Sequence, residues 1–412
     1  MTDRRAARLA LIFSSIGHVY AHMFMLLFPT VVLALEKQWQ LPYGELMLLL
    51  LPASILFGAG ALPAGWLGDR WSAPKMMVIY FLGTGGAAVL SGLVSTTVGL
   101  AVAMGLMGLF ASIYHPVGIA WLVRDAENRG RALGISGFFG AVGVALAPFL
   151  AGFLTDTISW RAAFIVPGLT CIAVGVVLAA LVSQGAVRDL VKGIAAAPEA
   201  PRGEMRQGAI VLIITVIVSG LIYQAASNNL PKLFDQRLGG TLDGIMGDGV
   251  VAVSALVSGI FLFSSLAQLA GGWLADRFRL RTVYIVCWAV QLPLLLLVAE
   301  LSSLWIWPAM FLVFAATSAS LPAENSLFAR YSPPQWRGTA FGIKFVLALG
   351  VSAAAIPLAS YIHLTTGGFY WLFVILAVLA GIAAIATWFL PRPKADKDAL
   401  LVSELSAKSS LG

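Results

Sequence analysis

The sequence predicts an all-α polytopic membrane protein whose twelve transmembrane helices form two pseudo-symmetric six-helix bundles. Of its 412 residues, 59% are hydrophobic and only 11% are charged, too few charges to cover the surface of a water-soluble fold. The apolar residues form runs of about 20 or more, the length at which a helix spans ~30 Å of hydrocarbon. A charged motif also recurs half a chain apart, as "AGWLGDRW" at 64–71 and "GGWLADRF" at 271–278.

The apolar runs give the transmembrane spans in chain order. We place them at 10–34, 45–67, 76–95, 98–122, 131–155, 161–183, 209–231, 250–274, 282–300, 304–328, 338–361 and 368–390. Glycine and proline interrupt many of these runs, which membrane helices tolerate because neighbouring helices satisfy the freed backbone groups. The first run follows three arginines as a secretory signal does, but its length predicts a retained helix.

The polar stretches between the spans predict the domain organisation and the orientation. We expect an N-terminal bundle at 1–183, a cytoplasmic linker at 184–208, a C-terminal bundle at 209–390 and a cytoplasmic tail at 391–412. With both termini inside, nearly all lysines and arginines fall on inner loops, as the positive-inside rule requires. The outer loops keep only Lys37, Arg161, Lys232 and Arg237. The net charge of +7 therefore indicates contact with anionic lipid of a bacterial inner membrane, and no nucleic-acid partner.

The recurring motif belongs to a longer internal duplication. "SIYHPVGIAWLVRDAENRGRALG" at 112–134 aligns with "SASLPAENSLFARYSPPQWRGTAFG" at 318–342, with a two-residue insertion. Pro116 matches Pro322, and Arg129 matches Arg337. Parallel repeats of this kind flank a site near the middle of the membrane and rock around it.

The motif "GWLGDRWSAPK" resembles the loop between helices 2 and 3 of the major facilitator superfamily. The resemblance covers the whole chain and implies the major facilitator fold. We expect the two copies to form a cytoplasmic latch in which the glycines permit close helix contact and Asp69 caps a helix or pairs with Arg129; the alternative is a set of charges that only fixes topology. The latch residues are Gly65, Asp69, Arg70, Arg129, Gly272, Asp276, Arg277 and Arg337.

Two further stretches extend the resemblance. "GFFGAVGVALAPFLAG" at 137–152 resembles the glycine-rich helix 5 of antiporters, and we expect it to pack tightly through Gly137, Gly140, Gly143, Pro148 and Gly152, which by itself requires no antiport. "GHVYAHMFMLLFPTVV" at 17–32 and "YHP" at 114–116 are similar to helices 1 and 4 of the fosmidomycin-resistance type of facilitator. His18 and His115 match that group, whereas its two acids are replaced by His22 and Val117. This narrower resemblance implies efflux.

Ionisable groups inside a membrane are costly, so each one is a candidate for function. His18 and His22 share a helix face that Met25 continues, and counting residues from the cytoplasmic charges puts His18 and His115 at similar depth. We expect these imidazoles and Tyr114 to meet and to bind substrate or carry protons. The alternative is a set of neutral histidines bonded to backbone carbonyls or to Tyr114.

Glu324 and Lys344 lie at matched depth on consecutive helices, and we expect an ion pair, because either charge alone would be costly there. The pair could be structural, or it could open for a substrate anion or a proton. Gln224 and Asn228, one helical turn apart in the seventh span, could bind substrate or simply join helices. Cys171 and Cys287 lie in apolar spans and are expected to be buried thiols.

These observations predict a secondary active transporter, not an enzyme, that moves a small anionic or zwitterionic organic solute by proton-coupled alternating access, in the direction of efflux. It would need no cofactor and act as a monomer with the solute, protons and lipid as partners. An ATP-driven pump is excluded because no Gly-x4-Gly-Lys loop is present. The alternative is a copper carrier with His18, His22 and Met25 as ligands, joined by Met23 and Met104 or Met107. A membrane enzyme would need more than the one embedded acid.

Overall fold

The computed structural model describes residues 3–125, 129–187, 202–246, 249–332 and 342–391. Within these residues, twelve helical segments are long and apolar enough to cross a membrane. The all-helical fold with twelve spans is therefore confirmed.

The first six spans contain nine helices and one π-helical turn. They are α1 (Asp3–Leu26), α2 (Phe28–Trp39), α3 (Tyr43–Leu48), α4 (Leu51–Arg70), α5 (Ala73–Leu93), α6 (Thr97–Ala111), η1 (Tyr114–Gly118), α7 (Ile119–Asp125), α8 (Arg129–Thr157) and α9 (Ala162–Ser183). The last six spans contain α10 (Arg202–Met246), α11 (Val250–Arg277), α12 (Leu280–Glu300), α13 (Ile306–Tyr331), residues 342–345, the π-helical turn η3 (Val346–Gly350), η4 (Val351–Ala354), α15 (Ala355–Thr366) and α16 (Tyr370–Trp388).

Local sequence signals explain where several helices begin and end. The hydroxyl of Thr96 accepts a hydrogen bond from the backbone N–H of Gly99 at 3.0 Å and thereby caps α6. Pro29 lies in the first turn of α2, where its missing N–H costs no helical hydrogen bond. Gly367 ends α15 with a φ of 72°, a left-handed conformation that glycine adopts without strain. The first crossing is therefore two helices, α1 and α2, joined at Leu27.

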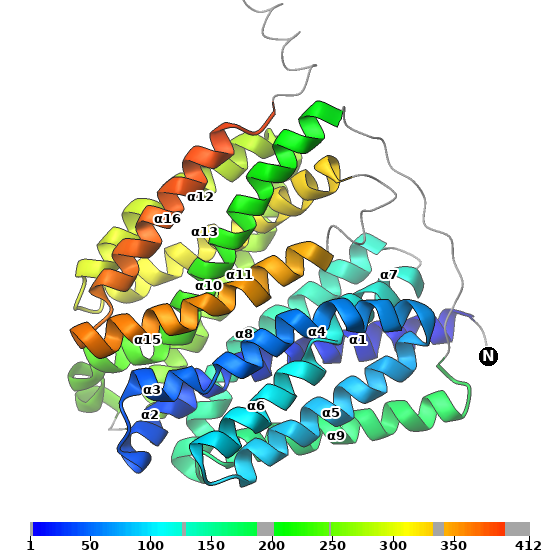
Figure 1. Ribbon diagram of the computed structural model, residues 1–412, viewed down its shortest axis with the longest axis horizontal. Coiled ribbons are helices and arrows are strands. Elements are labelled where there is room, and N and C mark those ends of the chain that lie inside the picture. Colours follow the sequence, from blue (N-terminus) through cyan, green and yellow to red (C-terminus); the bar gives the residue numbers. More distant parts are fainter. Residues whose placement is uncertain (1–2, 126–128, 188–201, 247–248, 333–341, 392–412) are drawn as a thin grey trace, which may run out of the picture.

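The two halves of the chain lie one beside the other. Figure 1 shows the first-half helices, blue to green, grouped together below the second-half helices, green to red. Within the halves, α5 packs on α9, α1 on α8, α11 on α13 and α12 on α16. The start of α10 and the end of α16 lie at one end of the molecule, since Gln207 donates to the carbonyl of Phe389 at 2.8 Å.

The glycine-rich helix α8 makes close contacts at three of its four predicted glycines. A side chain at Gly143 would overlap the backbone of Val19 in α1, and one at Gly152 would overlap Ser254 in α11. A methyl at Gly140 would lie 2.7 Å from the ring of His18. The expectation for Gly137 is wrong, because a methyl there would meet nothing within 4 Å. Pro148 lies inside α8, and the next N–H, of Phe149, donates to Ser258 in α11 at 2.9 Å.

The halves are joined at the end opposite the described termini, which we call the closed end and define by four cross-half contacts. Lys232 of α10 lies 2.7 Å from Glu36 of α2, and the Ser360 hydroxyl donates to the Gly44 carbonyl at 2.8 Å. The other two contacts join Tyr43 to Asn229 at 3.0 Å and the N–H of Val251 to Asp156 at 2.7 Å. Nearer the middle, Gly58 of α4 lies against Gly350 so closely that a side chain there would overlap backbone.

Besides Lys232, two basic residues of the predicted outer loops, Arg161 and Arg237, have structural partners at this end. Arg161 donates to the carbonyls of Gly92 and Val94 at 2.9 and 2.6 Å, at the end of α5. Arg237 does the same at the end of α12, where it reaches the carbonyls of Val298 and Leu301 at 2.5 and 2.6 Å. Since the last carbonyls of a helix lack partners of their own, these arginines cap equivalent helices of the two halves.

Candidate functional site

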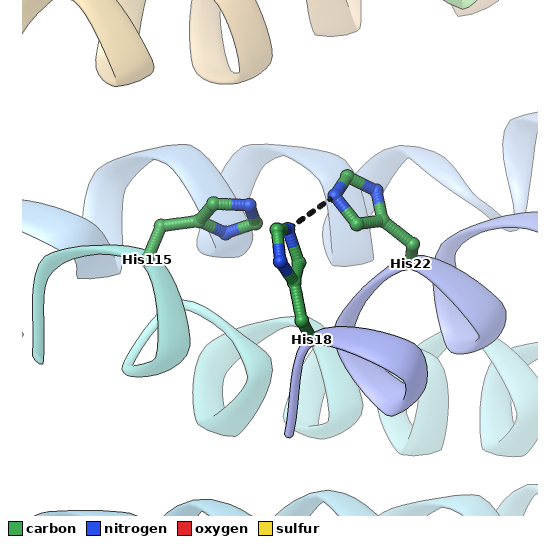
Figure 2. Close-up of side chains that lie close together, drawn as sticks. All are labelled: His18, His22 and His115. Atoms are coloured by element: carbon green, nitrogen blue, oxygen red, sulfur yellow. Dashed lines mark hydrogen bonds between the residues drawn. The ribbon is translucent and has the colours of Figure 1, made fainter. Parts of the chain in front are cut away.

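Three imidazoles from two helices converge inside the first half. His18 and His22 extend from α1 and His115 from η1, and their rings point toward a common centre (Figure 2). One nitrogen of each lies within 4.8 Å of the others. The Nε2 atoms of His18 and His22 are 3.0 Å apart, a hydrogen bond in which one ring donates its N–H to the lone pair of the other. The expected meeting of the imidazoles is therefore confirmed.

The ring of His18 is held in one tautomer by helix α8. Its Nδ1 lies 2.7 Å from the Ser136 carbonyl oxygen, which can only accept, so Nδ1 carries the proton. In the neutral ring, Nε2 is then unprotonated and accepts a hydrogen bond from the Nε2–H of His22 at 3.0 Å. The Ser136 hydroxyl lies 3.3 Å from that of Tyr114, whose ring lies 4.9 Å from His18. Tyr114 therefore belongs to the wall that fixes His18.

His115 lies in a segment where the regular α-helix is interrupted. Pro116 has no N–H to donate, and the segment Tyr114–Gly118 widens into a π-helical turn, a feature frequent at functional sites. The His115 side chain is buried, and its Nδ1 has no hydrogen-bond partner. Phe57 lies 5.7 Å from the His115 ring, and Phe345 of the second half lies 5.1 Å away. His115 therefore lies at the junction of the halves.

The second half contributes a buried ion pair beside this junction. Lys344 Nζ lies 2.7 Å from Glu324 Oε1, and both side chains are buried. The Tyr284 hydroxyl donates to Glu324 Oε2 at 2.8 Å, while Lys344 also donates to Asn325 Oδ1 at 2.5 Å. Both carboxylate oxygens thus have a donor, which a buried carboxylate requires. The predicted pair is present.

A small cavity lies next to the imidazoles and is lined by both halves. Gln224 and Asn228 line it from α10, and Met25, Ser54 and Phe57 are among the residues that line it from the first half. The Asn228 amide nitrogen donates weakly to Gln224 at 3.4 Å. The Asn228 Oδ1 atom is buried without a hydrogen-bond partner, so it can accept from a bound molecule. Met25, which was expected to continue the helix face of His18 and His22, lines this cavity. The third side chain of the imidazole cluster is that of His115.

The motif copies lie at the end of the molecule that holds the termini. Arg70 stacks on the Trp66 ring at 4.4 Å, and Arg277 stacks on the Trp273 ring at 4.7 Å, so the repeat positions its arginines identically. A methyl at Gly65 would lie 3.2 Å from Pro116. The expectation of close contact at Gly272 is wrong, since nothing lies within 4 Å; Gly271 makes that contact, against Ala319. Asp69 and Asp276 are exposed, and the side chains of Arg129 and Arg337 lie outside the described residues.

Several contacts of the site were not predicted. The site includes contacts between helices distant in sequence, made by Ser136, Tyr284 and Phe345. No local sequence pattern indicates that these residues belong to the site. The stacking of arginine on tryptophan had a signal, because the two residues recur four positions apart in both motif copies, on one helix face. The two buried cysteines, Cys171 and Cys287, are free thiols, as expected.

Comparisons with known proteins agree with this architecture. The sequence model of the Major Facilitator Superfamily matches residues 13–259 and 245–410. The multidrug resistance protein MdtG of Dickeya zeae (strain Ech586) is 25% identical over 364 residues, 85% of each chain. The probable 4-methylmuconolactone transporter of Cupriavidus pinatubonensis is 32% identical over 156 residues, 36% of each chain. A crystal structure of the peptide transporter POT with sulfate superposes with a TM-score of 0.75 at 14% identity, covering 95% of this chain and 97% of that one.

Proposed function

Because this chain belongs to the Major Facilitator Superfamily, and is a transporter and not an enzyme, we propose that it exports a small anionic or zwitterionic organic solute in exchange for protons. The observation that carries this proposal is the buried pair of Glu324 and Lys344 beside the contact of Phe345 with His115. A buried acid and a buried base in contact can act as a switch. A proton can take the place of Lys344 on the carboxylate, and an anion can take the place of Glu324 on the ammonium.

The coupling proton binds Glu324. In the closed pair, Lys344 neutralises the carboxylate at 2.7 Å. A zwitterionic solute enters this pair with its cationic group on the ionised Glu324 carboxylate and its anionic group on Lys344. Protonation of Glu324 removes the partner of that cationic group, so the proton and the solute exclude each other, as exchange requires. Tyr284 and Asn325 then keep the two side chains in place through the hydrogen bonds they already form. Proton binding and solute binding are thereby linked, which is the requirement for coupled transport.

The cavity binds the part of the solute that does not contact the ion pair. Apolar side chains such as Phe24 and Phe57 line most of it, and Gln224 and Asn228 add polar groups from the other half. Such a mixture suits a small organic molecule with one or two hydrogen-bonding groups. The resemblance to a multidrug resistance protein supports efflux, and that to a 4-methylmuconolactone transporter supports a small organic solute.

Transport proceeds by alternating access in a bacterial inner membrane, with both termini in the cytoplasm and the closed end facing outward. In the present conformation the halves are joined at that outer end through Glu36 and Lys232. Opening outward requires these contacts to separate and the cytoplasmic motifs to close. Asp69 and Asp276 would then form the latch by pairing with Arg129 and Arg337. We propose that one chain is sufficient for this cycle.

The proposal is tested with purified protein in liposomes that contain a pH-sensitive dye. Small carboxylates and phosphonates are screened for solute-dependent proton flux. In the Glu324→Gln variant we expect that flux to fall at least ~10-fold while exchange of solute for solute persists, because the neutral amide keeps the shape of the side chain but cannot carry a proton. The exposed Glu300→Gln serves as the matched control. Undiminished proton flux in Glu324→Gln would overturn the assignment of the coupling residue.

A further inference from the structure

We propose that His18, His22 and His115 bind one divalent transition-metal ion of the Zn²⁺ class through three imidazole nitrogens, and that the ion resides in the first half. This site goes beyond the proposed function, since neither coupling through Glu324 nor export of an organic solute requires a metal. It also differs from a copper site on α1 alone, because its third ligand comes from η1.

The geometry of the cluster fits three ligands of one ion. Zinc binds imidazole nitrogen at about 2.0–2.1 Å, so nitrogens at tetrahedral positions lie roughly 3.4 Å apart. The Nε2 atoms of His18 and His22 are already 3.0 Å apart, and all three nitrogens lie within 4.8 Å of one another. Rotation of the imidazoles about their side-chain bonds, without movement of either helix, closes the remaining difference.

The surroundings of His18 are those of a metal ligand. Imidazoles that bind metals commonly donate their second N–H to a carbonyl or carboxylate, which orients the ring and fixes its tautomer. The Ser136 carbonyl does this for His18 at 2.7 Å and leaves Nε2 directed at the other rings. Gly140 provides the space, because a methyl there would lie 2.7 Å from the His18 ring. Helix α8 therefore holds His18 ready to coordinate.

His115 gives an independent indication of a missing ligand. Its side chain is only 6% exposed, yet its Nδ1 has no hydrogen-bond partner. A buried polar atom without a partner is unfavourable, and such atoms mark places where a ligand or ion belongs. A metal ion at the centre of the cluster would complete the coordination of this imidazole.

The donor set selects the class of ion. Three neutral nitrogens suit zinc and the neighbouring first-row ions, whereas Mg²⁺ and Ca²⁺ prefer oxygen ligands. Three neutral ligands also leave the charge of the ion uncompensated, so the fourth position takes an anion or a water molecule. All three ligands belong to α1 and η1 of the first half, so separation of the halves would not dismantle the site. We therefore expect a resident ion and not a transported one.

The test measures binding to the purified full-length protein carrying a Strep-tag, because a polyhistidine tag would itself bind metal. We expect one Co²⁺ per chain with the visible absorption of tetrahedral coordination, and displacement of that signal by one equivalent of Zn²⁺. His18→Ala, His22→Ala and His115→Ala should each weaken binding by about 100-fold or more. His363→Ala is the matched control, since this imidazole lies at the closed end and bonds Gln236 at 2.9 Å.

Two further measurements exclude loss of folding and transport of the ion. Gly140→Ala keeps all three imidazoles but displaces the His18 ring, and binding should weaken by roughly 10-fold, the effect of disturbing the orientation of a ligand. Each variant is melted without metal, and only those that unfold like the wild type are compared. Co²⁺ binding that survives His115→Ala, or its absence from the folded wild type, would overturn the site. Accumulation of ⁶⁵Zn²⁺ by liposomes would overturn the assignment of a resident ion. None of these results depends on solute transport.

Discussion

The ring of Phe345 lies 5.1 Å from the imidazole of His115, across the junction between the two halves of the chain. Lys344 precedes Phe345 in sequence and lies 2.7 Å from Glu324. A π-helical turn adjoins each side of the contact, η1 at His115 and η3 directly after Phe345. Such turns are local departures from helical regularity that recur at functional sites, so the junction is a place where the ion pair and the imidazoles can influence each other.

The buried ion pair should make single substitutions more harmful than the double substitution. Glu324→Gln or Lys344→Met leaves one buried charge without its partner, and removing one member of such a pair costs about 3–5 kcal/mol. The double variant has no buried charge at this position and should unfold closer to the wild-type temperature. Thermal unfolding followed by the fluorescence of the 12 tryptophans measures this. If the double variant loses as much as the sum of the two singles, the two charges do not act as a pair.

Packing of α8 on α1 gives a matched pair of glycine substitutions. A side chain at Gly143 would overlap the backbone of Val19, which cannot move aside, so Gly143→Ala should destabilise the protein by about 1–3 kcal/mol. Gly137 lies on the same helix and a methyl there would meet nothing within 4 Å. Gly137→Ala should therefore leave stability unchanged or raise it slightly, because alanine favours a helix more than glycine does. Equal losses in the two variants would contradict this account of the packing.

The sequence was sufficient to predict the spans because hydrocarbon thickness sets the length of an apolar run. It did not predict helix ends, since polar residues continue a helix beyond the membrane: the seventh span was placed at 209–231, whereas α10 extends from Arg202 to Met246. The pairing of Glu324 with Lys344 could be predicted because a lone buried charge is so costly. The contacts of Ser136 and Phe345 could not, because they depend on how helices rotate and cross, which no local pattern records.

The unpartnered oxygen of Asn228 predicts a role in solute binding. Asn228→Leu removes a buried acceptor that meets no donor in the protein, together with a weak hydrogen bond of 3.4 Å to Gln224, so folding should be little affected. If a donor group of the solute uses this oxygen, KM should rise by roughly 10-fold, the size of one lost hydrogen bond in a buried site. Asn229→Leu is the contrasting variant, because Asn229 bonds Tyr43 at 3.0 Å and the Ala225 carbonyl at 2.7 Å and should affect stability instead. An unchanged KM in Asn228→Leu would remove this residue from the binding site.

Substitutions of two neighbouring acids should have different effects on the closed end. Lys232 lies 2.7 Å from Glu36 in the other half and 3.0 Å from Asp235 one turn along its own helix. Glu36→Gln removes an ion pair that must break whenever this end opens, whereas Asp235→Asn removes one that moves with α10 as a unit. Only Glu36→Gln should therefore favour the outward-open state. Asp235→Asn retains the cross-half pair and is its matched control.

Labelling of a single cysteine in the cavity distinguishes these outcomes. Ser54 lines the cavity, and in a background where Cys171 and Cys287 are replaced by serine, Ser54→Cys reports access from outside through a membrane-impermeant maleimide. We expect labelling in Glu36→Gln to be several-fold faster than in Asp235→Asn. An exposed ion pair contributes about 0–1 kcal/mol, and removing one partner of a more buried pair costs more than that, so a shift of roughly fivefold or greater is the appropriate threshold. Equal labelling rates in the two variants would mean that Glu36 and Lys232 do not hold the closed end together.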